Sequence, residues 1–455
     1  MEPKKPRWVD KPELDWTPET PLRFGPETSA LPHAIAWPGA PKQKPANQNT
    51  AQPGFVPRLA IGFGQGVALA ALFNLQDHSL SADSNLLAAH IMALTFAPFL
   101  LVQGLGRIPM RTLLIWTSFA AFGLAGLGVY HHWRIAGADA DHSGLWLAGL
   151  VAAFLFIGQS LLLGDARSGP GPVRYAVLYE SSWRLAIEVT LCGLFALLAW
   201  GLWTVCTGWL HMSTPLSSLA CTIPVVTLSL AVAAQWRAGP MLHLLKRVSV
   251  IGFTAILPLA ILLATGTILF GSLSRWRPPL ALCAAACVLL LIAINASYRG
   301  GGEWRPHWRR WLEFTGANLL LPLAVLAGLA LQMRVAQFGF TAPRVIAMAC
   351  VLLLSAYGLT YAGAAVISLS GGLWMQRLEG ANLLMAFVGL SLIATLASPL
   401  GDPVRLAVAS QNWRLMHGRV APEAFDYAYL RKSGLRFGQT VLATMAHPRA
   451  SRPKP

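Results

Sequence analysis

Residues 279–297 read PLALCAAACVLLLIAINAS, a run without one charged side chain. A helix that crosses the hydrocarbon core of a bilayer needs about 20 mostly apolar residues. Because lipid offers the backbone no hydrogen-bonding partner, a spanning segment is either a helix or part of a closed barrel. Barrel strands alternate apolar and polar residues. This run does not alternate, so it predicts a membrane-spanning helix.

Similar apolar runs follow one another between Phe55 and Leu400. They predict an all-α fold, a polytopic transmembrane helical bundle with about eleven spans. The expected spans are 57–75, 86–104, 112–130, 144–163, 185–209, 217–235, 248–271, 279–297, 312–332, 343–366 and 381–399. Pro224, Pro258 and Pro322 lie inside three of these runs, where neighbouring helices can satisfy the carbonyl groups that proline leaves free.

The composition is that of a membrane protein. Apolar residues make up 55% of the chain and charged residues 12%, whereas soluble proteins usually carry about 25% charged residues. The net charge of +16 does not indicate nucleic acid, because the basic residues lie between the apolar runs and in the two tails. The lipid bilayer is therefore the expected partner, and no nucleic acid is expected.

Two tails flank the membrane domain, which we place at residues 56–400. Residues 1–55 are rich in proline and poor in aliphatic residues, so they predict a disordered tail without the apolar core of a cleavable signal peptide. Three spaced tryptophans in this tail suit contact with the membrane surface or, alternatively, docking of a protein partner. Residues 447–455 predict a second disordered tail.

Residues 401–446 predict a small amphipathic cap. The stretch 404–416 has apolar positions at helical spacing, and a second helix is expected from Pro422 to Lys432, since proline suits a first turn. Gly434 then stands just past a helix end. A third short helix is expected over 435–446, and the three would lie on the membrane face, where a protein partner is also possible.

Orientation follows from the basic residues of the short loops. With the N-terminus inside, the inner loops carry Arg107, Arg111, Arg167, Arg174, Arg184, Arg237, Lys246, Arg247, Arg299, Arg305, Arg309, Arg310 and Arg377. The outer loops carry only Arg134, Arg275, Arg277, Arg334 and Arg344. The positive-inside rule therefore predicts a cytoplasmic N-terminus in a bacterial inner membrane, and eleven spans place the C-terminal cap outside.

Several short motifs lie in and before the cap. They are SPLGDPVR at 398–405, SQNWR at 410–414, GRV at 418–420, FDYAYLR at 425–431, YESSW at 179–183, NASY at 295–298 and QFGFT at 337–341. Together they resemble a bacterial membrane family, the domain of unknown function 4153, over residues 57–440. The motif residues are Trp183, Asn295, Tyr298, Gln337, Asp402, Arg405, Gln411, Arg414, Arg419, Asp426, Tyr429 and Arg431.

The resemblance implies the membrane architecture and implies no particular reaction. The acidic residue that usually follows the tyrosine motif is missing, because Arg299 and three glycines follow Tyr298. Trp304, Trp308 and Trp311 in the next loop suit an aromatic belt that anchors the chain at the interface. A hinge built on the glycines is the alternative.

Glu180, Arg184 and Glu188 are spaced by four, so they share one face of a helix. An ionisable group inside a span is by default a candidate functional site. The favoured interpretation is a structural ion-pair stripe in which Arg184 neutralises both acids. The alternative is a coupling-ion site of a transporter.

Histidines and aspartates gather in the first two outer loops. They are Asp77, His78, Asp83, His131, His132, Asp139, Asp141 and His142, with His90 just inside the second span. Imidazole and carboxylate groups together are ligands for zinc, manganese or similar ions. Their spacing matches no defined metal motif, so ordinary loop residues are the favoured interpretation.

The chain contains no nucleophile elbow, Walker loop, HExxH motif or paired catalytic carboxylates in a credible context. This argues against an enzyme, and no cofactor is expected. A transporter or channel-like protein is favoured by the many spans, the proline-broken helices and Glu188. The alternative is a membrane scaffold or envelope-assembly factor acting through its tails and cap, and a membrane enzyme ranks last.

Overall fold

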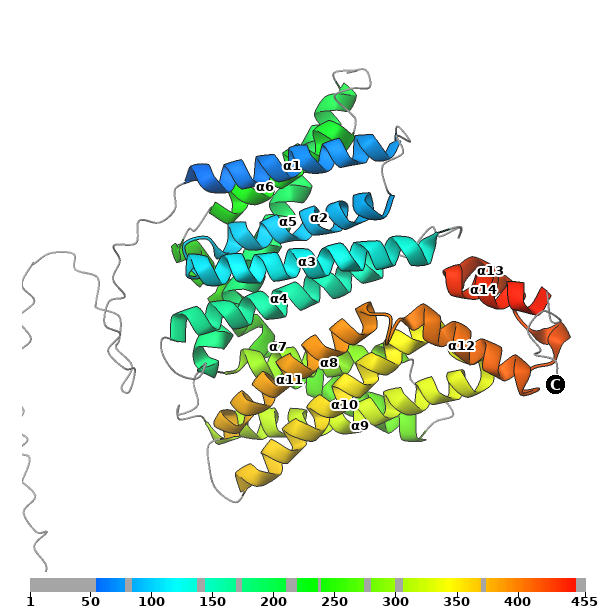
Figure 1. The fold of residues 1–455 in the computed structure, drawn as a ribbon. Coiled ribbons are helices and arrows are strands. Elements are labelled where there is room, and N and C mark those ends of the chain that lie inside the picture. Colours follow the sequence, from blue (N-terminus) through cyan, green and yellow to red (C-terminus); the bar gives the residue numbers. More distant parts are fainter. Residues whose placement is uncertain are drawn as a thin grey trace, which may run out of the picture. The chain divides into compact units, whose positions relative to one another are not determined.

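The computed structural model describes residues 55–77, 84–136, 144–168, 174–209, 219–235, 239–273, 280–298, 306–369 and 374–446. Within these ranges all regular structure is helical, which confirms the predicted all-α class. Figure 1 traces the helices along the chain, from α1 in blue to α14 in red. The two predicted tails lie outside the described residues, except for Phe55, which begins α1.

Eleven helices match the eleven expected spans. They are α1 (Phe55–Asp77), α2 (Ser84–Gly104), α3 (Met110–Ile135), α4 (Gly144–Ser168), α5 (Tyr175–Trp209), α6 (Leu219–Gln235), α7 (Gly239–Leu273), α8 (Leu280–Ala296), α9 (His307–Phe338), α10 (Ala342–Leu369) and α11 (Trp374–Ala397). Nine described helices are long and apolar enough to cross a membrane. The other two, α6 and α8, have 17 residues each, or about 26 Å against a core of ~30 Å. The chain is therefore a multi-pass membrane protein.

Large apolar side chains stand on the outside of these helices. Phe122 is 83% exposed, Leu198 72%, Leu262 69% and Phe270 72%. Extended apolar surface of this kind is rare on soluble monomers. In a bilayer it faces hydrocarbon, which is as apolar as the side chains themselves.

The membrane helices pack as two groups. In the first group, α1–α6, α1 packs against α6 and α2 against α3; in the second, α7–α11, α9 packs against α10. Each group has buried residues of its own, such as Leu100 and Leu124 in the first and Leu290 and Leu320 in the second. The groups meet where α4 and α5 contact α11 and where α5 contacts α7. We call this meeting region the junction.

The contact between α1 and α6 depends on two glycines. A Cβ atom at Gly62 would lie 2.6 Å from the Cβ of Ala231, and one at Gly66 would lie 2.4 Å from the Cα of Pro224. Neither distance leaves room for a side chain. Gly62 and Gly66 therefore allow the two helices to approach closely, in the manner of small-residue contacts between membrane helices.

The cap consists of α12 (Pro403–Met416), α13 (Tyr427–Ser433) and α14 (Leu435–Ala446). α12 begins where the sequence indicates, because Asp402 accepts hydrogen bonds from the backbone N–H groups of the first turn and Pro403 suits the first position. Val404, Phe425 and Leu430 form its small apolar core.

The predicted helix start at Pro422 is wrong. Pro422–Ala424 form a single 3₁₀ turn (η1), and α13 begins at Tyr427 because Asp426 accepts a hydrogen bond from the backbone N–H of Tyr429 at 2.9 Å. Gly434 does follow α13, but its φ of −77° is not left-handed. A glycine is needed there for space instead, since a Cβ would lie 2.4 Å from the carbonyl oxygen of Leu430.

Candidate functional site

Glu188 is the central acid of a charged cluster between the end of α2 and α5. Arg107, in the turn after α2, donates two hydrogen bonds to the Glu188 carboxylate, each at 2.6 Å. Arg184 donates a third from Nε at 3.0 Å. Glu188 is 8% exposed. Both of its oxygens are thus held by guanidinium groups in strong, charge-assisted bonds.

The prediction that Arg184 neutralises both acids is wrong for Glu180. Arg184 pairs with Glu188, whereas Glu180 forms an ion pair with Lys246 of α7. Spacing along one helix does not show which neighbouring helix supplies a lysine, so the sequence could not indicate this pair. The contact between Glu180 and Lys246 joins α5 to α7 across the junction.

Arg58 and Arg167 lie at the same end of the bundle. Arg58 is 2% exposed and donates to the carbonyl oxygens of Val102 at 3.1 Å and Leu105 at 2.5 Å, at the end of α2. Arg167 donates to the hydroxyl of Ser181 at 3.2 Å. Sequence reasoning missed Arg58, whose only signal was a charge at the start of the first expected span.

Four side chains from four helices form a partly buried hydrogen-bond network. Asn382 of α11 donates to Oδ1 of Asn295 of α8 at 2.7 Å and to the hydroxyl of Tyr175 of α5 at 2.8 Å. Asn295 donates to Tyr361 of α10 at 2.8 Å, and Tyr361 donates back to Asn382 at 2.6 Å. The network includes a residue of α5, so it holds the first group against the second.

Tyr298 lies next to this network. Its hydroxyl donates to the carboxylate of Glu379 of α11 at 2.7 Å, and its ring centroid lies 5.1 Å from that of Tyr175 and 4.9 Å from that of Tyr179. Tyr298 thus bonds to an acid on a different helix, 81 residues away in the chain. The ring of Trp183 lies nearby and meets that of Tyr179 edge-on, with centroids 6.3 Å apart.

Of the three tryptophans predicted to form an interfacial belt, only Trp308 and Trp311 are among the described residues. Trp308 is 65% exposed and Trp311 63% exposed at the start of α9, as a belt residue would be. Trp304 and the three glycines lie outside the described residues. The anchor and the hinge therefore both stay predictions.

Asp402 joins α3 to the cap. It is 0% exposed, and its Oδ2 accepts from the Tyr130 hydroxyl and from Nη1 of Arg134, each at 2.8 Å. Its Oδ1 accepts from the backbone N–H groups of Val404 at 2.8 Å and Arg405 at 3.3 Å. Four donors thus satisfy this buried carboxylate. Tyr130 and Arg134 were not predicted as site residues.

Gln411 and Arg414 of α12 bind the turn between α9 and α10. The Gln411 side chain donates to the carbonyl oxygens of Phe338 at 3.0 Å and Phe340 at 2.8 Å. Arg414 donates to the carbonyl oxygen of Gln337 at 3.0 Å, while the Gln337 side chain is exposed. The cap therefore lies at the end of the bundle where α3 and α9 end, which we call the cap end.

The remaining motif residues of the cap differ in role. The Tyr429 hydroxyl accepts a hydrogen bond from the backbone N–H of Ala342 at 3.2 Å, and burial raises the pKa of Tyr429. Arg405 donates to the carbonyl oxygen of Pro399 at 2.7 Å. Arg419 and Arg431 are exposed, and their side chains form no ion pair within the described part of the chain.

The predicted metal ligands are mostly outside the described residues. His78, Asp83, Asp139, Asp141 and His142 lie there entirely, and so does the side chain of Asp77. Of the others, His131 shares a hydrogen bond with Arg134 at 3.0 Å, His132 lies beside it on α3, and His90 bonds its own helix. No group of three potential ligands occurs in the described ranges. Metal binding by the loops stays a prediction.

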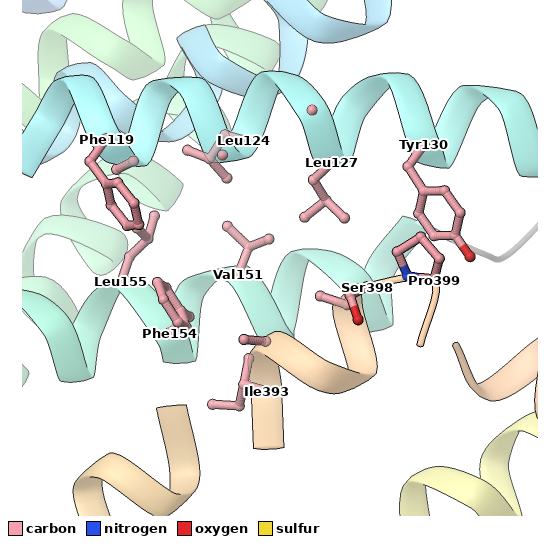
Figure 2. Close-up of a pocket in the computed structure, with 15 residues that line it drawn as sticks. Phe119, Leu124, Leu127, Tyr130, Val151, Phe154, Leu155, Ile393, Ser398 and Pro399 are labelled. Carbon is pink, nitrogen blue, oxygen red and sulfur yellow. The ribbon is translucent and has the colours of Figure 1, made fainter. Parts of the chain in front are cut away.

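An apolar groove of about 340 Å³ lies between α3, α4 and α11 (Figure 2). Figure 2 shows Phe119 and Phe154 toward one end of the groove and Tyr130, Ser398 and Pro399 toward the other. Leu124, Leu127, Val151 and Ile393 line the space between them. No sequence pattern indicated the groove, because helices from both groups form it.

Comparison of the chain with protein-family models, with curated proteins and with solved structures finds no match. The resemblance to the domain of unknown function 4153 therefore stays a prediction.

Proposed function

We propose that this membrane protein is a transporter-like carrier for an amphipathic substrate that enters from the bilayer. The observation that carries the proposal is the junction. Two helix groups, each with its own buried core, meet there, and the apolar groove opens between α3 and α4 of one group and α11 of the other. Many transporters work by rocking one helix group against another around a site between them.

Polar contacts at both ends of the junction support this proposal. At the cap end, Arg134 of the first group pairs with Asp402, which follows α11. At the opposite end, Glu180 of α5 pairs with Lys246 of α7. Ion pairs of this kind can break and re-form, so they suit an interface with two packed arrangements.

Glu188 does not act as a coupling-ion site in this carrier. Arg107 and Arg184 hold both carboxylate oxygens, so a bound cation would have to displace two guanidinium groups. The geometry supports the structural ion-pair interpretation for Glu188 instead.

Locking the junction tests the proposal. Cδ1 of Ile157 on α4 lies 3.9 Å from where a Cβ would stand at Gly389 on α11. We expect cysteines at these two positions, in a chain without its native cysteines, to cross-link on oxidation. In vesicles that contain a fluorescent phospholipid, the cross-link should stop protein-dependent transfer of the lipid between leaflets, and reduction should restore it.

The matched control is a cysteine pair inside one helix group. Gly328 of α9 and Val351 of α10 are such a pair, since a Cβ at Gly328 would lie 3.5 Å from Cγ1 of Val351. Oxidation of this pair should leave lipid transfer unchanged. The proposal would be contradicted if the two oxidised cysteine variants transferred lipid equally well, or if the protein without a cross-link transferred none.

We also propose a bacterial inner membrane and a cytoplasmic N-terminus. In support, the basic cluster of Arg58, Arg107, Arg167 and Arg184 gathers at the end of the bundle where α1 begins. Basic residues favour the cytoplasmic side of a membrane. The cap would then face the periplasm.

A scaffold role is the second candidate. Trp413 is 51% exposed and Met416 74% exposed on α12 of the cap, and such residues are enriched where proteins bind partners. Replacing both by serine should abolish capture of a specific partner if the protein is a scaffold. Unchanged capture would count against this alternative.

A further inference from the structure

The groove has the features of a lipid site, and the following inference rests on the proposed function and specifies its substrate class. We propose that the groove between α3, α4 and α11 binds one acyl chain of a membrane lipid with an anionic headgroup, and that Arg405 binds the headgroup.

The shape of the groove suits a single chain. Its lining on α3 runs from Phe119 to Tyr130, a distance of about 17 Å at 1.5 Å per residue. Its volume of about 340 Å³ lies at the lower end of the ~300–1,000 Å³ that is usual for small-molecule sites. Because α3, α4 and α11 are all candidate membrane spans, the groove is accessible to the hydrocarbon chains of the surrounding lipids.

Two glycines of α3 give the groove its width. No heavy atom of the chain outside the immediate helix backbone lies within 4 Å of the positions that Cβ atoms would take at Gly123 and Gly126. Both glycines line the groove. Side chains added at these two positions would occupy the space proposed for the acyl chain without clashing with the protein, which permits a direct test.

The end of the groove at Pro399, which we call its polar end, carries the positive charge of Arg405, and no acid among the residues that the structure describes compensates this charge. Arg405 donates from Nη1 to the carbonyl oxygen of Pro399, a lining residue, at 2.7 Å. The nearby Asp402 carboxylate is already satisfied by Tyr130, Arg134 and two backbone N–H groups.

Within the described ranges, no carboxylate lies within 4.0 Å of the guanidinium of Arg405. A guanidinium has five N–H donors, and phosphate oxygens match their fork geometry. An anionic phosphate headgroup therefore complements this end of the groove, while the acyl chain complements the rest.

Photo-labelling tests both parts of the site. The full-length protein is placed in phosphatidylcholine vesicles with a trace of phosphatidylglycerol or phosphatidylcholine that carries a photoreactive group on one acyl chain. We expect preferential labelling by the anionic lipid, at peptides that contain residues 119–130 and 393–399. Changing Gly123→Leu together with Gly126→Leu should lower labelling by both lipids at least tenfold.

The matched control uses two glycines of α5. Positions Gly193 and Gly201 also have no heavy atom within 4 Å of an added Cβ, and they do not line the groove. Gly193→Leu with Gly201→Leu should therefore label like the natural sequence. Equal labelling of the groove variant and this control would overturn the proposal.

The role of Arg405 in binding the headgroup is tested separately. Arg405→Gln should lower labelling by the anionic lipid several-fold and leave labelling by phosphatidylcholine unchanged, whereas Arg405→Lys should keep part of the preference. An unchanged preference in Arg405→Gln would overturn the role of Arg405. Complete competition by inorganic phosphate would mean an ion site rather than a lipid site.

Failure of this inference and failure of the carrier proposal give different results. Labelling measures binding at equilibrium and does not need movement at the junction. The oxidised Ile157–Gly389 cysteine pair should therefore block lipid transfer and keep the labelling. Normal labelling without any transfer would refute the carrier and support the site.

Discussion

Glu188 shows how one buried acid can be held in a membrane domain. A single carboxylate facing one arginine of its own helix would keep unfilled acceptor positions, but Arg107 approaches from the turn after α2 and binds both oxygens. The side chains of Arg107 and Glu188 are only 7% and 9% exposed, whereas that of Arg184 is 32% exposed. The two arginines should therefore differ in their contribution to stability.

Arg107→Met is expected to destabilise the protein far more than Arg184→Met. Removing one partner of a buried ion pair costs about 3–5 kcal/mol, because the other charge stays buried. The partly exposed Arg184 should cost roughly 1 kcal/mol or less. Thermal unfolding midpoints of the two variants in the same detergent measure the difference, and equal midpoints would contradict it. Combining Arg107→Met with Glu188→Met should recover most of the lost stability.

Asp402 joins the cap to α3 through a buried ion pair with Arg134 and a hydrogen bond from Tyr130. Asp402→Asn keeps an oxygen for capping α12 but removes the charge that neutralises buried Arg134. We expect α12 and α13 to exchange amide hydrogens at least several-fold faster in this variant. Arg419→Gln, on the exposed surface of the cap, is the control and should exchange like the natural sequence. Equal exchange in both variants would exclude this role.

At the level of elements, the pair α1 and α6 shows packing that apolar character alone does not specify. α6 has only 17 residues, and its position depends on the close approach of Gly62 and Gly66. Gly64 lies between them in the sequence but does not contact α6, because a Cβ added there would have nothing within 4 Å. One helix thus offers a contact position and an open position two residues apart.

Gly62→Leu should disrupt the contact between α1 and α6, and Gly64→Leu should not. The first change forces side-chain atoms into Ala231 and the carbonyl oxygen of Thr227, and overpacking of this kind costs about 1–3 kcal/mol or more. The yield of monodisperse protein and the unfolding midpoint provide the measurement. Similar behaviour of both variants would show that the helices do not pack closely there.

At the level of the whole molecule, the position of the cap and the direction of the chain are linked. The cap binds α3 and the turn after α9, the ends that an alternating path puts opposite the start of α1. If the N-terminus is cytoplasmic, Arg419 in the cap faces the periplasm and Trp308, at the start of α9, faces the cytoplasm.

A membrane-impermeant maleimide tests this orientation in intact cells. With the native cysteines replaced, Arg419→Cys should react from outside, and Trp308→Cys should react only after the membrane is opened. Both positions are exposed in the structure, so reactivity reports the side of the membrane. The reverse pattern would invert the proposed topology, and reaction of both from outside would refute the alternating path.

The sequence predicted the parts of this protein that local composition controls. The eleven apolar helices follow from hydropathy, and the positions of α12 and α14 follow from helical spacing, although α5 and α7 begin about ten residues before the expected spans. The predicted start of the second cap helix at Pro422 was wrong because Pro422 begins only a 3₁₀ turn, whereas Asp426 accepts the first-turn hydrogen bond with which α13 begins.

What the sequence determined by itself was therefore a chain of apolar helices that has to lie in lipid, since hydrocarbon leaves a backbone no other way to satisfy its polar groups. The tertiary structure alone decided which charges from different helices meet. Glu188 with Arg107, Glu180 with Lys246, and Arg134 with Asp402 join residues that are distant in the chain. Hydrophobicity drives helices into the bilayer without distinguishing among partners there, so these pairings and the groove depend on three-dimensional packing.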